Sequence, residues 1–227
     1  MKHYYLNKKN QSKLILFFCG WGNDYHPFLN LLCKDYDVLM LYDYRDLKTE
    51  IDFQELLASY KEVHLISWSL GVFVANHLFQ DVPFSSTSAI NGTLQAIDDR
   101  LGIPVAIFDG TIQLFNERNR DKFFKRMCLH PEAITFFEKN KPERELDEQL
   151  EELKILRDLI LNHPPKKNIY NRAIIGTEDA IFPPQNMIHY WNGLVTEENL
   201  IQLEAPHFLF HLYRQWSDLC PSILKNH

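Results

Sequence analysis

The stretch that decides the fold reads Val63-His64-Leu65-Ile66-Ser67-Trp68-Ser69-Leu70-Gly71 and continues into residues 72–79, which are mostly apolar. Residues 63–66 predict a strand buried on both faces of a sheet, and residues 72–79 predict a buried helix. The residues between them therefore predict a tight turn from a strand into a helix.

Ser69 is the residue of this turn that we expect to be reactive. Where a strand passes directly into a helix the two backbones crowd, so small residues are needed two positions before and after the central one. Around Ser69 these are Ser67, in place of the usual glycine, and Gly71. Around Ser67 they would be Leu65 and Ser69, a poorer fit. The spacing favours Ser69 as a nucleophile, although a serine before a helix is more often an N-cap.

Strand-like stretches recur on both sides of this turn. They span residues 14–18, 37–42, 86–90, 172–175 and 200–203, and residues 53–60 have helical spacing. Strands alternating with helices predict an α/β fold with a mostly parallel sheet and helices on both faces. Residues 110–165 break the alternation and predict short, charged helices. We expect a single domain over residues 1–227, with this segment as a helical lid insertion.

A carboxylate follows the strand predicted at residues 172–175. The chain there reads Gly176-Thr177-Glu178-Asp179-Ala180-Ile181-Phe182-Pro183. The spacing from the strand and from the proline favours Asp179 over Glu178 as a catalytic acid, whereas an isolated aspartate more often caps a turn. The loop at residues 91–93, Asn-Gly-Thr, is the other place for an acid and offers no carboxylate.

A histidine follows the strand predicted at residues 200–203. His207 comes directly after Pro206 in this loop, and His211 is the second choice for a base. The order Ser69, Asp179, His207 is the chain order of the α/β-hydrolase triad. In such a triad the histidine takes the serine proton, and the aspartate holds the imidazole in the required tautomer. We therefore predict an α/β-hydrolase fold carrying a serine hydrolase.

Two backbone N–H groups are expected to stabilise the oxyanion that forms when the serine attacks. Leu70 follows the nucleophile directly, and Trp21 lies in the glycine-containing loop after residues 14–18. Donors fixed in advance at this position are a large part of catalysis in acyl transfer.

The composition excludes several other classes of protein. The net charge of −6 argues against a general nucleic-acid binder. The four cysteines, Cys19, Cys33, Cys128 and Cys220, form no Cys-x-x-Cys pair, so we expect no metal site, no cofactor and reduced thiols in the cytoplasm. The N-terminal residues lack the apolar core of a secretory signal, and the apolar run at residues 14–19 is too short to span a membrane.

The sequence resembles the BioG-type pimeloyl-[acyl-carrier protein] methyl ester esterases. The resemblance rests on Phe17-Phe18-Cys19-Gly20-Trp21-Gly22-Asn23-Asp24, on Tyr42-Asp43-Tyr44-Arg45 and on residues 67–72. It implies hydrolysis of the methyl ester of pimeloyl-acyl-carrier protein in biotin synthesis. It also implies a triad of Ser69, Asp179 and His207, with Trp21 and Leu70 as oxyanion donors. Cys19 is interpreted as a packing residue.

A basic run at residues 118–126 fits an acidic carrier protein as partner. It contains five basic residues against one acid: Arg118, Arg120, Lys122, Lys125 and Arg126, with Asp121. A chain of net negative charge needs such a local patch to receive an acidic protein, although a solvated helix face explains the run equally well. Five phenylalanines of the insertion could line an acyl channel or form the core of the insertion: Phe115, Phe123, Phe124, Phe136 and Phe137.

Two alternative functions remain open at the level of sequence. A thioesterase or a general carboxylesterase would need the same triad on the same fold. An interaction protein that kept the fold but lost activity is the other alternative, and retention of all three triad residues in order speaks against it.

Overall fold

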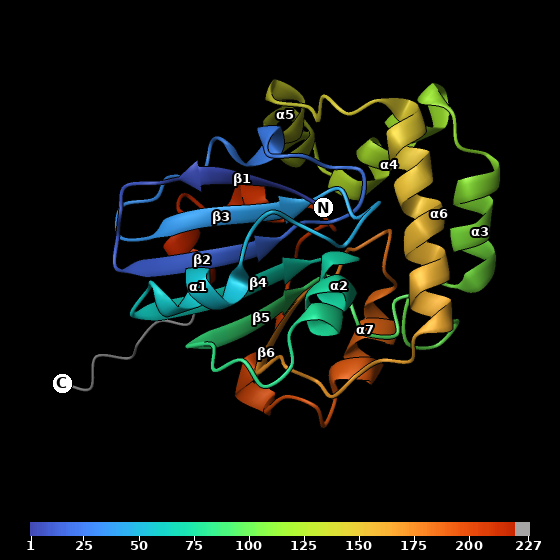
Figure 1. Ribbon diagram of the computed structural model, residues 1–227. Helices are drawn as coiled ribbons and strands as arrows, with labels where there is room; N and C mark the ends of the chain where they lie inside the picture. The colour runs from blue at the N-terminus through green and yellow to red at the C-terminus, as the bar shows by residue number, and fades with distance from the viewer. Residues whose placement is uncertain (221–227) are drawn as a thin grey trace.

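A seven-stranded sheet forms the centre of the computed structural model, which describes residues 1–220 (Figure 1). The strands are β1 (Lys2–Asn7), β2 (Lys13–Phe18), β3 (Asp37–Tyr42), β4 (Glu62–Trp68), β5 (Ser86–Ile90), β6 (Arg172–Gly176) and β7 (Leu200–Leu203). Their order in the sheet is β1-β3-β2-β4-β5-β6-β7. Strands β2 to β7 pair in parallel, and β1 pairs antiparallel with β3. The predicted mostly parallel α/β sheet is therefore confirmed.

The sequence does not predict β1, and the reason is its position at the edge of the sheet. Residues 2–4 of this strand are exposed, and the other three are only partly buried. A strand with so little burial lacks the apolar pattern by which strands are recognised.

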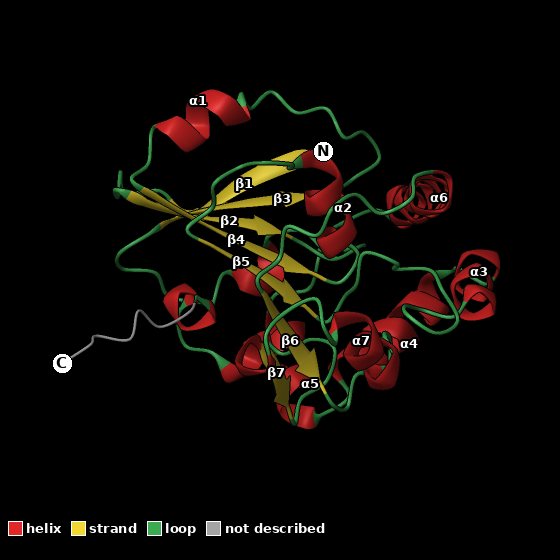
Figure 2. Ribbon diagram, turned by 90° about the horizontal axis from the view of Figure 1, so that it is seen from below, coloured by secondary structure: helices red, strands yellow, loops and turns green. Residues whose placement is uncertain are grey.

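The two faces of the sheet are covered differently. Neighbouring residues of a strand point to opposite faces. Phe18 contacts Phe79 at the end of α2 (Gly71–Leu78), with ring centroids 5.7 Å apart. Phe17 instead packs against Phe28, Phe210 and Trp216 of the 3-10 helices η1 (His26–Phe28), η3 (Phe210–Leu212) and η4 (Trp216–Leu219). Figure 2 shows α1 (Phe53–Ala58) on the same side of the sheet as α2.

Four helices lie between β5 and β6 and are called here the helical segment. They are α3 (Val105–Gln113), α4 (Glu117–Cys128), α5 (Pro131–Lys139) and α6 (Leu146–Asn162). The segment starts at Val105, earlier than residue 110, because Pro104 is its N-cap and ends the preceding loop. Figure 1 shows α3, α4 and α6 beyond the carboxyl ends of β2 and β4. The helical segment thus covers the edge of the sheet where parallel α/β proteins place their sites.

After β6 the chain forms α7 (Pro184–Trp191) and the 3-10 helix η2 (Glu197–Asn199) before β7. The sequence does not predict α7, which packs against β6. Within residues 1–220, no helix is long and apolar enough to cross a membrane. The same residues contain no group of three or more His, Cys, Asp or Glu side chains placed to hold a metal ion.

Candidate active site

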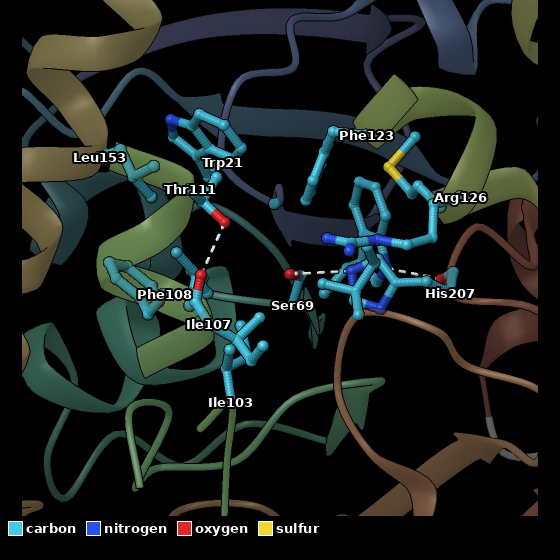
Figure 3. A pocket seen from close by; sticks show the side chains of 15 residues that line it. Trp21, Ser69, Ile103, Ile107, Phe108, Thr111, Phe123, Arg126, Leu153 and His207 are labelled. Atoms are coloured by element: carbon cyan, nitrogen blue, oxygen red, sulfur yellow. Dashed lines mark hydrogen bonds between the residues drawn. The ribbon is translucent and has the colours of Figure 1, made fainter. Parts of the chain in front are cut away.

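A hydrogen-bonded chain joins Ser69, His207 and Asp179 at the carboxyl edge of the sheet. Figure 3 shows the bond between Ser69 and His207. Oγ of Ser69 lies 3.0 Å from Nε2 of His207, and Nδ1 of His207 lies 2.6 Å from Oδ2 of Asp179. The three side chains are buried and come from the loops after β4, β7 and β6. This geometry allows the imidazole to take a proton from the serine while the carboxylate fixes the orientation of the ring.

Ser69 lies in the left-handed region of backbone space, with φ of +58°. Such a conformation costs a non-glycine residue about 1–3 kcal/mol and is typical of functional turns. Gly71 makes the turn possible, since a Cβ there would lie 2.4 Å from the carbonyl oxygen of Cys19. The helix α2 can therefore start directly against the end of β2. The Ser69 side chain then faces a cavity beneath the helical segment.

The loop after β6 holds one oxygen of the Asp179 carboxylate. Oδ1 accepts hydrogen bonds from the N–H groups of Ile181 (2.7 Å) and Phe182 (2.8 Å), so Oδ2 is left for His207. Glu178 points elsewhere, with Oε2 2.6 Å from Nε2 of His130. His211, the alternative base, has Nδ1 3.1 Å from the carbonyl oxygen of Phe208. The structure brings Asp179 to His207, and neither Glu178 nor His211 takes part in the chain.

The loop after β2 lies directly against Ser69. A Cβ on Gly20 would come within 3.0 Å of Cβ of Ser69, so only glycine allows this approach. Within residues 1–220, the backbone N–H groups of Trp21 and Leu70 have no hydrogen-bond partner. Burial raises the pKa of the Cys19 thiol well above its ordinary value, so this residue next to the loop stays an uncharged packing residue.

Two neighbouring cavities lie over Ser69. The inner cavity is lined by Ser69, His207, Trp21 and apolar residues of the helical segment. The outer cavity lies between α3 and α4 and shares four lining residues with the inner one: Ile107, Thr111, Phe123 and Arg126. The two cavities therefore lie side by side, with these four residues between them.

The aromatic residues of the helical segment divide between these cavities and its core. Phe115 and Phe123 line the outer cavity, and both rings also contact Trp21. Phe124 and Phe137 pack against each other, while Phe136 and Phe137 contact Phe208. Of the five predicted channel residues, only Phe123 lines the inner cavity, and Phe115 lines the outer cavity next to it.

Comparison with known proteins agrees with this geometry. Residues 1–219 match the family described as pimeloyl-ACP methyl esterase BioG. The chain belongs to this family. Its structure is similar to the crystal structure of BioG from Haemophilus influenzae, with a TM-score of 0.88 and 31% identity over 96% of this chain and 99% of that one. The resemblance to BioG-type esterases in the sequence is confirmed.

One relative of this BioG-family chain is a longer protein. A malonyl-[acyl-carrier protein] O-methyltransferase of Bacteroides fragilis is 39% identical over 190 residues, which cover 82% of this chain and 38% of that protein. The chain thus spans well under half the length of this relative. A lipase-esterase related protein of Clostridium acetobutylicum shares the fold, with a TM-score of 0.56 and 18% identity over 93% of both chains. The α/β-hydrolase fold is confirmed.

The predicted docking residues of this BioG-family chain lie on or at the start of α4. The side chains of Arg118, Lys122, Lys125 and Arg126 are exposed, whereas Arg120 is half-buried and pairs with Glu117 and Asp121. Lys122 and Arg126 line the outer cavity, and Arg126 also reaches the inner one. Figure 3 shows the Arg126 side chain beside His207. Two residues of the basic run, Lys122 and Arg126, therefore border the cavities, and Arg126 belongs partly to the site itself.

Asn91 is a residue of the site that the sequence does not predict. Its Nδ2 donates to the carbonyl oxygens of His207 (2.9 Å) and Pro206 (3.1 Å), and its Oδ1 accepts from the N–H of Gly176 (2.7 Å). It thus ties the loop of the base to the end of the strand that precedes the acid. Its place directly after the strand predicted at residues 86–90 is the one signal in the sequence, whereas its φ of +45° is seen in the structure.

We expect Asn91→Ala to destabilise the fold by about 1–3 kcal/mol, because a buried backbone N–H and two carbonyl groups lose their partners. Urea denaturation monitored by tryptophan fluorescence measures this effect. Asn192→Ala, at an exposed asparagine, is the matched control. An unfolding free energy equal to that of the wild type would show that Asn91 does not hold the two loops together.

Proposed function

We propose that this chain hydrolyses the methyl ester of pimeloyl-acyl-carrier protein in biotin synthesis, with Ser69 as nucleophile, His207 as base and Asp179 as acid. The single observation that supports it most is the buried Ser69–His207–Asp179 chain at the base of a cavity, in a protein of the BioG family. A triad of this kind activates a hydroxyl that is otherwise a weak nucleophile.

The reaction proceeds in two acyl-transfer steps. Oγ of Ser69 attacks the ester carbonyl as its proton passes to Nε2 of His207, and the N–H groups of Trp21 and Leu70 donate to the oxyanion. The intermediate then collapses, and His207 returns the proton to the departing methoxide, which leaves as methanol. Water attacks the acyl-serine by the same route and releases the carboxylic acid, still attached to its carrier.

The helical segment acts in this proposal as a lid over the site. The ester end of the substrate occupies the inner cavity, and the acyl chain leaves through the outer cavity between α3 and α4. The position of the two cavities side by side, with Ile107, Thr111, Phe123 and Arg126 lining both, supports this path. Mostly apolar walls suit an alkyl chain, because burying methylene groups is favourable.

The basic run at residues 118–126 is proposed as the docking surface for the acidic carrier. Within residues 1–220, Arg118, Lys122 and Lys125 make no ion pair, so their charges are available to a partner. Exposed charges of this kind raise the rate of encounter more than they tighten the bound complex, and salt screens them over roughly 8 Å.

Reversing three of these charges should slow turnover of the carrier-linked ester. We expect Arg118→Glu, Lys122→Glu and Lys125→Glu together to lower kcat/KM by about 10-fold or more at low salt, and less at high salt. Arg126 is left unchanged because it lines the inner cavity. Hydrolysis of a small neutral ester should stay within about 2-fold of the wild type, since the triad is untouched.

A matched control reverses Lys34, Lys61 and Lys167, which are exposed and precede β3, β4 and β6. These residues lie toward the amino ends of the strands, opposite the edge that carries Ser69. Their reversal changes the net charge by the same amount. Equal losses in the two triple variants would mean that net charge, and not this surface, governs encounter. No loss on the carrier-linked ester would place docking elsewhere.

A thioesterase on the same fold is the alternative that the triad alone does not separate. Turnover of a small methyl ester and of the matching acyl thioester compares the two activities directly. We expect the methyl ester to be hydrolysed with the higher kcat/KM. A clear preference for the thioester would replace esterase by thioesterase as the function.

A further inference from the structure

The loop after β2 is fastened to α6 by hydrogen bonds that the triad does not use. Nε2 of Gln149 donates to the carbonyl oxygen of Gly22 (2.7 Å), and Nε1 of Trp21 donates to the carbonyl oxygen of Gln149 (2.7 Å). The N–H of Gly22 donates to Oε2 of Glu152 (3.2 Å). Two successive peptide groups of the loop, Trp21–Gly22 and Gly22–Asn23, directly after the N–H of Trp21, are therefore held by side chains of a helix about 130 residues away.

Glu152 is the centre of this arrangement. Its side chain is fully buried, its Oε1 accepts from the N–H of Tyr44 (2.9 Å), and its Oε2 also accepts from Arg144. The hydroxyl of Tyr44 in turn donates to the carbonyl oxygen of Cys19 (2.8 Å). One carboxylate thus connects the end of β3, the loop after β2 and α6.

The carboxylate of Glu152 pairs with Arg144, which in turn contacts the motif Tyr42-Asp43-Tyr44-Arg45 that the triad leaves without a role. Arg144 bridges Glu152 to Asp43, with Nη2 3.0 Å from Oδ1 of Asp43. Arg45 holds Asp43 through two hydrogen bonds of 2.8 Å each. Burial acts to raise the pKa of Asp43, but the bonds from Arg45 and the charge of Arg144 outweigh it and keep that pKa below its ordinary range.

We propose that Glu152, together with Gln149, is a positioning residue that sets the backbone N–H of Trp21 for the oxyanion. This inference rests on the proposed function, because it concerns the oxyanion donors of that reaction. A buried ion pair is in general weak evidence for stability, since apolar residues of similar volume often stabilise as well. Here the acceptor atoms are directed at backbone groups of the catalytic loop. An error of about 1 Å in such a loop can cost about 100-fold in rate.

Glu152→Gln tests the proposal with little change in size. One carboxylate oxygen becomes an NH₂ group, which cannot accept, so either the N–H of Tyr44 or those of Gly22 and Arg144 lose their acceptor and the arrangement loses part of its support. We expect kcat for a small ester to fall by about 10- to 100-fold with KM within about 2-fold of the wild type. Glu151→Gln is the matched control, because its carboxylate is exposed, lies one residue away and bonds to Arg45 alone among residues 1–220.

A pair of inhibitors separates positioning from a general structural role. An alkyl trifluoromethyl ketone forms an adduct with the serine that places an oxyanion among the donors, whereas the matching methyl ketone binds without one. We expect Glu152→Gln to weaken the trifluoromethyl ketone by the same factor as kcat, and to leave the methyl ketone unchanged. Equal weakening of both ketones, or of neither, would overturn the proposal.

Gln149→Met keeps the test decisive where the buried Glu152 variant fails to fold. It removes the bond to Gly22 and introduces no unpaired charge. We expect kcat to fall and the trifluoromethyl ketone to bind more weakly, each by about 2- to 10-fold, because one neutral hydrogen bond is lost. Kinetics identical to the wild type in this variant would contradict the proposal. Activity retained by Ser69→Ala would contradict the proposed function itself. Unchanged kinetics in Gln149→Met would contradict only the positioning role, so the two outcomes are distinguishable.

Discussion

Replacing Ser69 with alanine should abolish ester hydrolysis, with kcat reduced by about 10⁶-fold, the loss typical of removing a triad nucleophile. The hydroxyl lies 3.0 Å from Nε2 of His207 in the wild type, and no other hydroxyl bonds to this nitrogen within residues 1–220. Ser67→Ala should retain most of the activity, because Ser67 lies inside β4 and is fully buried.

Hydrolysis of a chromogenic short-chain ester and labelling by a fluorophosphonate probe measure this difference. The wild type and Ser67→Ala should be labelled, and Ser69→Ala should not. Full activity or undiminished labelling in Ser69→Ala would exclude the serine mechanism proposed for this site.

Asp179→Asn should lower kcat by about 10³–10⁴-fold while the fold is kept. The amide oxygen can still accept from the N–H groups of Ile181 and Phe182, so the NH₂ group is directed at Nδ1 of His207. An NH₂ group donates, which forces Nδ1 to accept and places the ring proton on Nε2. The imidazole then cannot take the proton of Ser69.

Glu178→Gln is the control for the acid, since its carboxylate contacts His130 and not His207. Steady-state kinetics on the same ester compare the two variants. We expect Glu178→Gln to keep near wild-type kcat. If it were the more damaging of the two, the acid would be assigned one position away from the true residue.

The fold is largely predictable because its central strands are buried on both faces. Runs such as residues 14–18 and 37–42 have no exposed side, so their apolar character is continuous and easy to recognise. Strand β1 carries no such signal, since half of its residues are exposed. Helix α7 begins with Pro184 and buries only Met187 and Trp191, which leaves a short and weak apolar pattern.

The positions of Ser69, Asp179 and His207 are predictable for a related reason. Each follows a strand of the parallel sheet, so local sequence is enough to bring them to one edge, where the structure joins them by hydrogen bonds. Their catalytic roles stay predictions. Asn91 and Glu152 act through contacts 85 to 130 residues away along the chain, and no local pattern indicates such partners.

The mass of the carrier protein after reaction tests the central claim most directly. Pimeloyl-acyl-carrier protein methyl ester is incubated with the wild type and with Ser69→Ala, and the intact carrier is analysed by mass spectrometry. The account predicts a carrier that keeps its acyl chain but has exchanged the methyl group for a proton, with the wild type only. A carrier released with a free thiol, or one left fully methylated by the wild type, would contradict it.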